Sequence, residues 1–134
     1  MGDNGGVIRF LSPEWLAALD AAAAGNESLG RSVADTDLIV RQVVLGGPDG
    51  DVTYYLRLVG GTAGVTTDGD GADIDVVQDY DTAAAISRGE LAPAAAFAAG
   101  RIKLGGSVGR LIRNGGVATG LGDLFGALRA STTY

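Results

Sequence analysis

The chain has 134 residues, a formal net charge of −6, and neither cysteine nor histidine. This length suits one domain that buries roughly two-thirds of its unfolded surface. The missing residue types exclude a Ser-His-Asp triad, a thiol nucleophile, a Cys/His zinc site and any disulfide bond. The acidic balance argues against a nucleic-acid groove, which needs clustered Lys and Arg.

The N-terminal residues have neither the basic region nor the apolar run of a signal peptide. No apolar run approaches the length of about 18 residues that a membrane span needs. We therefore expect a cytoplasmic protein whose single domain occupies residues 1–134 and begins with a short lead-in over residues 1–11.

The first regular element predicted is a helix over residues 12–24. Ser12 can cap it, and Pro13 fits the first helical position because its φ angle is already set. Gly25 stops the run. The apolar residues at helical spacing are Trp15, Leu19, Ala22 and Ala23.

From residue 37 the hydrophobic period changes to the two-residue period of a strand. Residues 37–45 and 52–59 are β-rich runs joined by a Gly/Pro/Asp turn, which predicts an antiparallel hairpin. Shorter runs at 64–67, 72–78 and 101–104 predict three further strands.

Between the fourth and fifth strands the pattern returns to that of a helix. Asp81 or Thr82 can cap a helix that extends to Arg88, and Pro93 begins an Ala-rich turn that Gly100 ends. Two helical elements are thus expected between these strands.

The tail, residues 114–134, is predicted to be a Gly-rich hinge followed by a C-terminal helix. Another short helix is expected before it, over residues 108–113. The apolar stripe of the last helix consists of Leu121, Leu124, Phe125 and Leu128. Such a narrow stripe fits an ordinary docked helix, a movable lid over a cavity or a partner-binding helix.

Side chains at alternate positions of a strand share one face of the sheet, and the charged residues of these strands all fall on one of the two sets, or parities. This pattern predicts one solvated face and one covered face. All helices must then lie on the same side. The fold class expected is α+β, a two-layer domain with a five-stranded, mainly antiparallel sheet covered on one face by helices. The covered parity carries Leu38, Val40, Gln42, Val44, Tyr54, Leu56, Val76, Ile102 and Leu104.

Two motifs with chemical associations have simpler explanations. Gly105–Gly109 matches the G-x-S-x-G nucleophile elbow, but a serine there needs a base and the chain has no His. Ser107 is therefore interpreted as a helix cap in a glycine turn. Asp68–Asp73 resembles part of a calcium loop, yet its glycines are misplaced for an EF-hand, and a tight β-turn explains it. We expect no metal and no cofactor.

The sequence FAAGRIKLGGSVGRLIR at residues 97–113 resembles the C-terminal signature of the sterol carrier protein type-2 family. In that signature a Gly follows an apolar residue, and a basic–apolar–basic–apolar strand, a Gly turn and an apolar helix come next. The element order agrees with the family from residue 12 to about residue 113. Ser107 stands where the family often shows Asp or Asn, and the tail is not covered by the resemblance.

This resemblance implies an apolar tunnel between sheet and helices that binds a hydrophobic lipid without covalent chemistry: a sterol, fatty acid, acyl-CoA or phospholipid. Small helix residues opposite large strand residues can leave such room. The lipid-binding residues we predict are Trp15, Leu19, Leu38, Val40, Tyr54, Leu56, Val76, Phe97, Ile102, Leu104, Leu111, Ile112, Leu124 and Phe125.

Two other classes stay open. A small isomerase-like enzyme would need an Asp or Glu with a raised pKa inside the cavity, opposite a Tyr or a second acid. Tyr54 is expected to face inward, but the strand aspartates Asp73 and Asp75 are predicted on the wet face. A protein-interaction module with a collapsed core is the other.

The basic residues Arg101, Lys103, Arg110 and Arg113 suggest a transient contact with an anionic membrane surface. No nucleic-acid partner is expected, and the protein is expected to be a monomer or a dimer.

Overall fold

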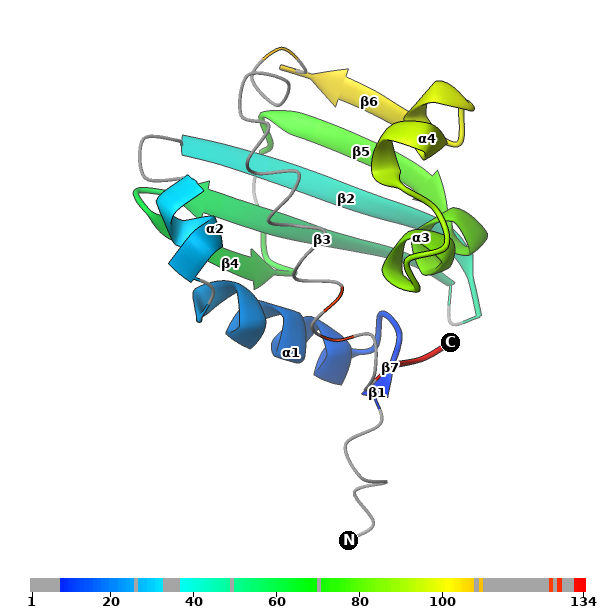
Figure 1. The fold of residues 1–134 in the computed structure, drawn as a ribbon, viewed down its shortest axis with the longest axis horizontal. Coiled ribbons are helices and arrows are strands. Elements are labelled where there is room, and N and C mark those ends of the chain that lie inside the picture. The colour runs from blue at the N-terminus through cyan, green and yellow to red at the C-terminus, as the bar shows by residue number, and fades with distance from the viewer. Residues whose placement is uncertain are drawn as a thin grey trace, which may run out of the picture.

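The computed structural model describes residues 8–25, 27–32, 37–48, 50–69, 71–107, 109, 126, 128 and 132–134. Figure 1 shows the arrangement of its elements. The helices are α1 (Pro13–Ala24), α2 (Glu27–Ser32), α3 (Tyr80–Ser87) and α4 (Pro93–Ala98). The strands are β1 (Ile8–Arg9), β2 (Asp37–Gly47), β3 (Gly50–Val59), β4 (Thr62–Thr66), β5 (Ile74–Asp79), β6 (Ile102–Gly106) and β7 (Thr132–Thr133).

The main sheet has five strands in the order β4-β3-β2-β5-β6. The predicted hairpin is confirmed: β2 and β3 pair antiparallel, with Val40 opposite Leu56. β5 crosses over to pair parallel with β2, whereas β4 and β6 pair antiparallel with their neighbours. The sheet is therefore mainly antiparallel, as the sequence predicts.

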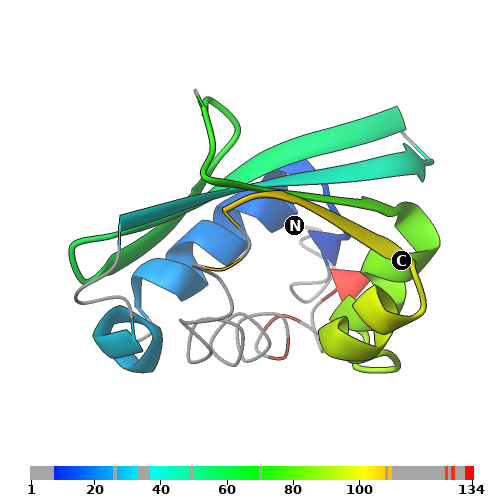
Figure 2. The ribbon, with the colours of Figure 1, turned by 90° about the horizontal axis from the view of Figure 1, so that it is seen from above.

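One face of this sheet is covered and the other is open. Figure 2 shows the helices gathered on a single side of the strands. Burial follows the predicted parity: Leu38, Val40 and Val44 of β2 are buried, whereas Arg57 of β3 and Lys103 of β6 are exposed. The α+β two-layer fold class is confirmed.

The first helix forms as its local sequence predicts. Ser12 adopts an extended conformation, and its side chain accepts a hydrogen bond from the Trp15 amide at 3.1 Å. This bond satisfies one of the amides that the start of a helix leaves free. The helix buries Trp15 and Leu19 completely, so its apolar face is packed into the core.

The predicted cap of the third helix is wrong by two or three residues. Neither Asp81 nor Thr82 caps α3, because the helix begins earlier, at Tyr80, and Asp79 is its N-cap. The Thr82 amide donates to Asp79 Oδ1 at 2.8 Å. These hydrogen bonds from Thr82 lower the pKa of the Asp79 carboxyl, because they favour its charged form.

Three elements were not predicted. The six-residue helix α2 follows α1 after a break at Gly25. β1 and β7 form a two-stranded parallel pair in which Ile8 lies opposite Thr132 and Arg9 opposite Thr133. Part of the expected lead-in is thus a strand, although two residues are too few to show a strand period.

Gly109 of the helix expected over 108–113 is helical, and the rest of that helix and most of the Gly-rich tail lie outside the described residues. Gly126 and Leu128 of the expected C-terminal helix are helical. Leu128 is partly buried and packs against the hydrophobic core.

Candidate functional site

Most of the apolar residues predicted to bind a lipid meet on the covered face of the sheet. Those that the structure buries in one core are Trp15, Leu19, Leu38, Val40, Tyr54, Leu56, Val76 and Ile102. Leu104 is half-buried and packs against them. The strands and α1 therefore bring these side chains together, and their contact with a ligand stays a prediction.

Phe97 is the exception among the described residues of the predicted site. Its exposed fraction is 53%, whereas that of the adjacent Ala96 is 0%. One residue turns a helix by about 100°, so the orientation of α4 that buries Ala96 turns Phe97 to solvent. Phe97 is thus not part of the covered face. Leu111, Ile112, Leu124 and Phe125 lie outside the described residues.

Two glutamines interrupt the apolar covered face. Gln42 of β2 is 8% exposed and accepts a hydrogen bond from Gln78 Nε2 of β5 at 3.1 Å. Among the residues that the structure describes, Gln78 Oε1 is a buried oxygen without a hydrogen-bond partner. A buried polar atom left unpaired costs free energy, so the covered face holds an unused hydrogen-bonding group.

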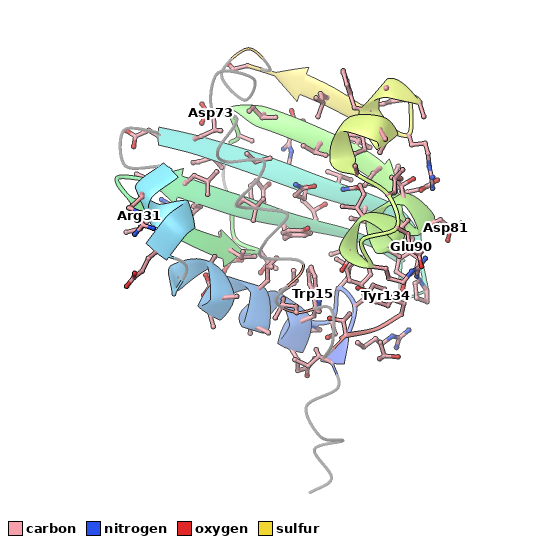
Figure 3. The ribbon with its side chains drawn as sticks, viewed as in Figure 1. Trp15, Arg31, Asp73, Asp81, Glu90 and Tyr134 are labelled. Carbon is pink, nitrogen blue, oxygen red and sulfur yellow. The ribbon has the colours of Figure 1, made fainter. Side chains whose placement is uncertain are left out.

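Aromatic side chains close one end of this face. Trp15 and Tyr54 meet edge to face, with ring centroids 6.3 Å apart, and Phe10 meets Trp15 at 4.9 Å. Burial raises the pKa of the Tyr54 hydroxyl, so Tyr54 stays neutral at physiological pH. Figure 3 shows Tyr134 near Trp15, and its ring centroid lies 4.9 Å from that of Phe10.

A pocket of about 570 Å³ opens at the other end of α1. Figure 3 shows Arg31, one of its lining residues, beside α2 and away from Trp15. Ala23 and Ala63 line the pocket and also belong to the buried core. The full lining is Ala23, Ala24, Glu27, Gly30, Arg31, Gly61, Thr62 and Ala63.

Two glycine backbones form one wall of this pocket. A Cβ atom on Gly30 would lie only 2.9 Å from the carbonyl oxygen of Gly61, so α2 can approach the β3–β4 turn this closely only with glycine there. The volume lies within the range of about 300–1,000 Å³ that is usual for ligand pockets. The pocket thus offers a route from solvent toward core residues.

None of the predicted lipid-binding residues that the structure describes lines the pocket. Its walls come from α1, α2, the β3–β4 turn and the start of β4, and most of the lining side chains are small. Small residues carry no chemical signature in a sequence. The sequence features that could have indicated the pocket are the Gly60–Gly61 pair and the Ala-rich end of the first helix. The glycine pair fits an ordinary turn equally well.

Asp73 and Asp75, at the start of β5, both accept hydrogen bonds from β2. Arg41 Nε donates to Asp75 Oδ1 at 2.5 Å on the open side of the sheet. This bond and the Asp75 charge raise the pKa of Arg41. The backbone amide of Ile39 donates to Asp73 Oδ2 at 2.8 Å. Neither carboxyl is placed to act as an acid or base opposite Tyr54.

Ser107 and the basic residues lie at the β6 edge. The Ser107 amide donates to the carbonyl oxygen of Asp73 at 2.7 Å. Ser107, Arg101 and Lys103 are exposed, and Arg101 Nε also donates to Thr82 Oγ1 at 3.1 Å. Arg110 and Arg113 lie outside the described residues, and of the helix that Ser107 is expected to cap the structure describes Gly109 alone.

Within the described ranges, no group of His, Cys, Asp and Glu side chains is arranged to hold a metal ion. None of the helices described is both long enough and apolar enough to cross a membrane.

No protein-family model matches the sequence, and no curated protein matches it significantly. Solved structures do match the fold. A conserved protein of Thermus thermophilus, suggested to be a sterol carrier protein, has a TM-score of 0.73 at 19% identity, covering 93% of this chain and 91% of its own.

A crystal structure of sterol carrier protein 2 has a TM-score of 0.70 at 20% identity and covers 90% of this chain and 97% of its own. The palmitated SCP2L2 of Aedes aegypti matches at a TM-score of 0.50 and 14% identity, over 74% of this chain and 92% of its own. The protein therefore has the sterol carrier protein 2 fold.

Proposed function

We propose that the protein binds a hydrophobic lipid between the covered face of its sheet and its helices, and that it carries this lipid without covalent chemistry. The observation that carries the proposal is the single covered face, rich in buried apolar side chains, within a fold shared with sterol carrier proteins. Each methylene group of the ligand that leaves water contributes about 0.8 kcal/mol.

The ligand classes proposed are sterols, fatty acids, acyl-CoAs and phospholipids. The palmitated SCP2L2 structure supports a single acyl chain as one ligand that this fold can hold. The pocket beside Ala23 and Ala63 supports an entry route, because its small side chains give access to residues of the core. The exposed Arg101 and Lys103 support a transient contact with an anionic membrane surface during loading.

The hydrogen bonds of two aspartates weigh against the isomerase-like enzyme, one of the two other classes of function. Asp75 is paired with Arg41 on the open side of the sheet, and Asp73 accepts a hydrogen bond from the Ile39 amide, so neither carboxyl is free to serve as the internal acid of an isomerase-like site. A protein-interaction module with a collapsed core is distinguished from a lipid carrier by the titration below, in which such a module would bind neither lipid. Lipid binding is the function that the fold and the site both support.

The test is a titration with two fluorescent lipids, dehydroergosterol and NBD-labelled stearate. The chain has one tryptophan, so energy transfer from Trp15 to a bound lipid reports binding directly. We expect saturable binding of at least one lipid with a dissociation constant of micromolar order or below. Titrations of both lipids without saturation would overturn the proposal.

The entry route is tested with a matched pair of variants on α1. Ala24→Trp places a large side chain in the pocket, and Ala21→Trp adds the same side chain to the same helix outside the pocket lining. Both alanines are exposed, so neither change overpacks the core. We expect slower lipid uptake in the first variant alone; equal uptake rates would place the entry elsewhere.

A further inference from the structure

The two glutamines of the covered face form a single polar site. Gln42 lies directly opposite Val76 of β5, and Gln78 lies opposite Val44 of β2. The two side chains are thus diagonal neighbours on the same face of a parallel pair. Their amides are joined by the 3.1 Å bond from Gln78 Nε2 to Gln42 Oε1.

The residues beside this pair on the neighbouring strands are mainly apolar. The cross-strand neighbour of Gln42 on its other side is Tyr54, and Gln78 has Ile102 of β6 beside it. Tyr54 and Ile102 are both buried. Inside such a low-dielectric environment a hydrogen bond is strong, and a missing one is correspondingly costly.

The free atom of the pair is an acceptor. Gln78 Nε2 is used within the pair, and Gln78 Oε1 is buried without a partner among the described residues. The hydrogen bond between the two glutamines therefore does not satisfy the whole pair. The side-chain carbonyl oxygen of Gln78 remains a buried acceptor that Gln42 does not pair with.

We infer that the Gln42–Gln78 pair is a hydrogen-bonding site for the hydroxyl group of a lipid bound on the covered face. This inference rests on the proposed function and specifies its ligand as a long-chain or sterol alcohol. A hydroxyl group donates and accepts, so it can bond to an amide in either orientation.

A charged head group fits this site poorly. The cationic side chains on the described strands of the main sheet, Arg41, Arg57 and Lys103, occupy the opposite parity and face the open side of the sheet. A carboxylate or phosphate beside the glutamines would thus be desolvated with no counter-ion from these strands, which is unfavourable. A neutral alcohol needs only the one hydrogen bond that Gln78 Oε1 offers.

The inference is tested by competition between two lipids that differ only at the head. The protein is incubated with equimolar 1-hexadecanol and 1-methoxyhexadecane, separated from free lipid, and its bound lipid is extracted and quantified by mass spectrometry. The ether has the same chain and an oxygen acceptor but no donor. We expect the bound lipid to favour the alcohol by about tenfold, the size of one net buried hydrogen bond.

A double variant, Gln42→Leu with Gln78→Leu, removes the site. Replacing both hydrogen-bond partners with apolar groups of similar size leaves no amide unpaired, so this variant is expected to fold. In this variant the ratio of bound alcohol to bound ether should fall to about one. The total amount of bound lipid should stay close to that of the unmodified protein. The matched control, Val43→Leu with Val77→Leu, changes the same two strands at a directly opposed pair on the open face and should keep the preference.

The outcomes separate the inference from the proposed function. If the unmodified protein binds both lipids equally, or if the double variant keeps the preference for the alcohol, the inference is wrong while lipid binding stands. If the unmodified protein binds neither of these lipids nor the two fluorescent ones, the proposed function is wrong and the inference falls with it.

Discussion

The indole N–H of Trp15 donates a hydrogen bond to Thr132 Oγ1 over 3.2 Å, although 117 residues separate them in sequence. Thr132 Oγ1 in turn donates to the Leu128 carbonyl oxygen at 2.6 Å. The first turn of α1 is thereby joined to β7. One threonine hydroxyl satisfies two polar groups at this junction.

Replacing Thr132 by Val should destabilise the protein. The change keeps the branched shape but removes the hydroxyl, so the buried indole N–H loses this acceptor at a cost of about 1–2 kcal/mol. The measurement is urea unfolding followed by Trp15 fluorescence. Thr133→Val is the control, because Thr133 is exposed. Equal unfolding free energies for the two variants would show that the bond contributes little.

Replacing Leu104 by Trp should reduce lipid binding with little effect on folding. Leu104 is half-buried against the core, so a larger side chain there enters the space proposed for the ligand. Lys103→Trp makes the same change at an exposed neighbour on the opposite parity. Affinity for NBD-labelled stearate and the circular dichroism spectrum are compared for both. Undiminished affinity in the Leu104 variant would place the ligand elsewhere.

Replacing Asp79 by Ala should cost about 1 kcal/mol at neutral pH, since α3 loses its N-cap. The folded state lowers the pKa of Asp79, so its stabilising effect is complete above the unfolded pKa of about 3.9 and is lost as pH falls through the lower folded value. The difference in unfolding free energy between this variant and the unmodified protein should therefore shrink on strong acidification.

Asp81→Ala serves as the comparison for Asp79→Ala, since Asp81 is an exposed carboxyl in the first turn of the same helix. Its loss should have a smaller effect at neutral pH. An Asp79 effect that is unchanged by acid would contradict the charged cap.

Two glycines with the same backbone conformation should respond differently to alanine. Gly100 and Gly106 have φ angles of 77° and 78°. A Cβ atom on Gly100 meets nothing within 4 Å, whereas on Gly106 it would lie 2.2 Å from the Asp73 carbonyl oxygen. Gly100→Ala should cost about 1–2 kcal/mol through left-handed strain alone. Gly106→Ala should cost at least about 1 kcal/mol more, because β6 must also shift against β5. Similar costs in urea unfolding would contradict this close approach.

The sheet was predictable because charge and apolar residues alternate along every long strand. Gln42 even falls on the covered parity in the sequence pattern, but its bond to Gln78 depends on the parallel pairing of β2 with β5, which no local pattern specifies. The cap of α3 was missed because Asp79, Asp81 and Thr82 are all capping residues. Only the extent of β5, which ends at Asp79, selects among them.

The features of the site that the sequence did not predict, the exposure of Phe97 and the pocket, both depend on contacts between distant elements. Phe97 is the largest side chain of α4, but a six-residue helix is too short to reveal which side faces the core. The pocket is lined mainly by small residues of α1, α2, the β3–β4 turn and the start of β4, and its shape exists only after these elements meet. The hydrophobic pattern of the strands predicted the covered face well. It could not predict a pocket that forms where distant backbone segments meet.

The parallel pairing of β2 with β5 has a consequence for synthesis on the ribosome. β2, β3 and β4 follow one another in sequence and can pair as soon as residue 66 has emerged. Until β5 and β6 follow, the long edge of β2 has no strand beside it, and unpaired edges of this kind recruit other chains. Translation of residues 74–106 is thus the interval in which a nascent chain is most exposed to aggregation, and a pause placed before it would lengthen that exposure.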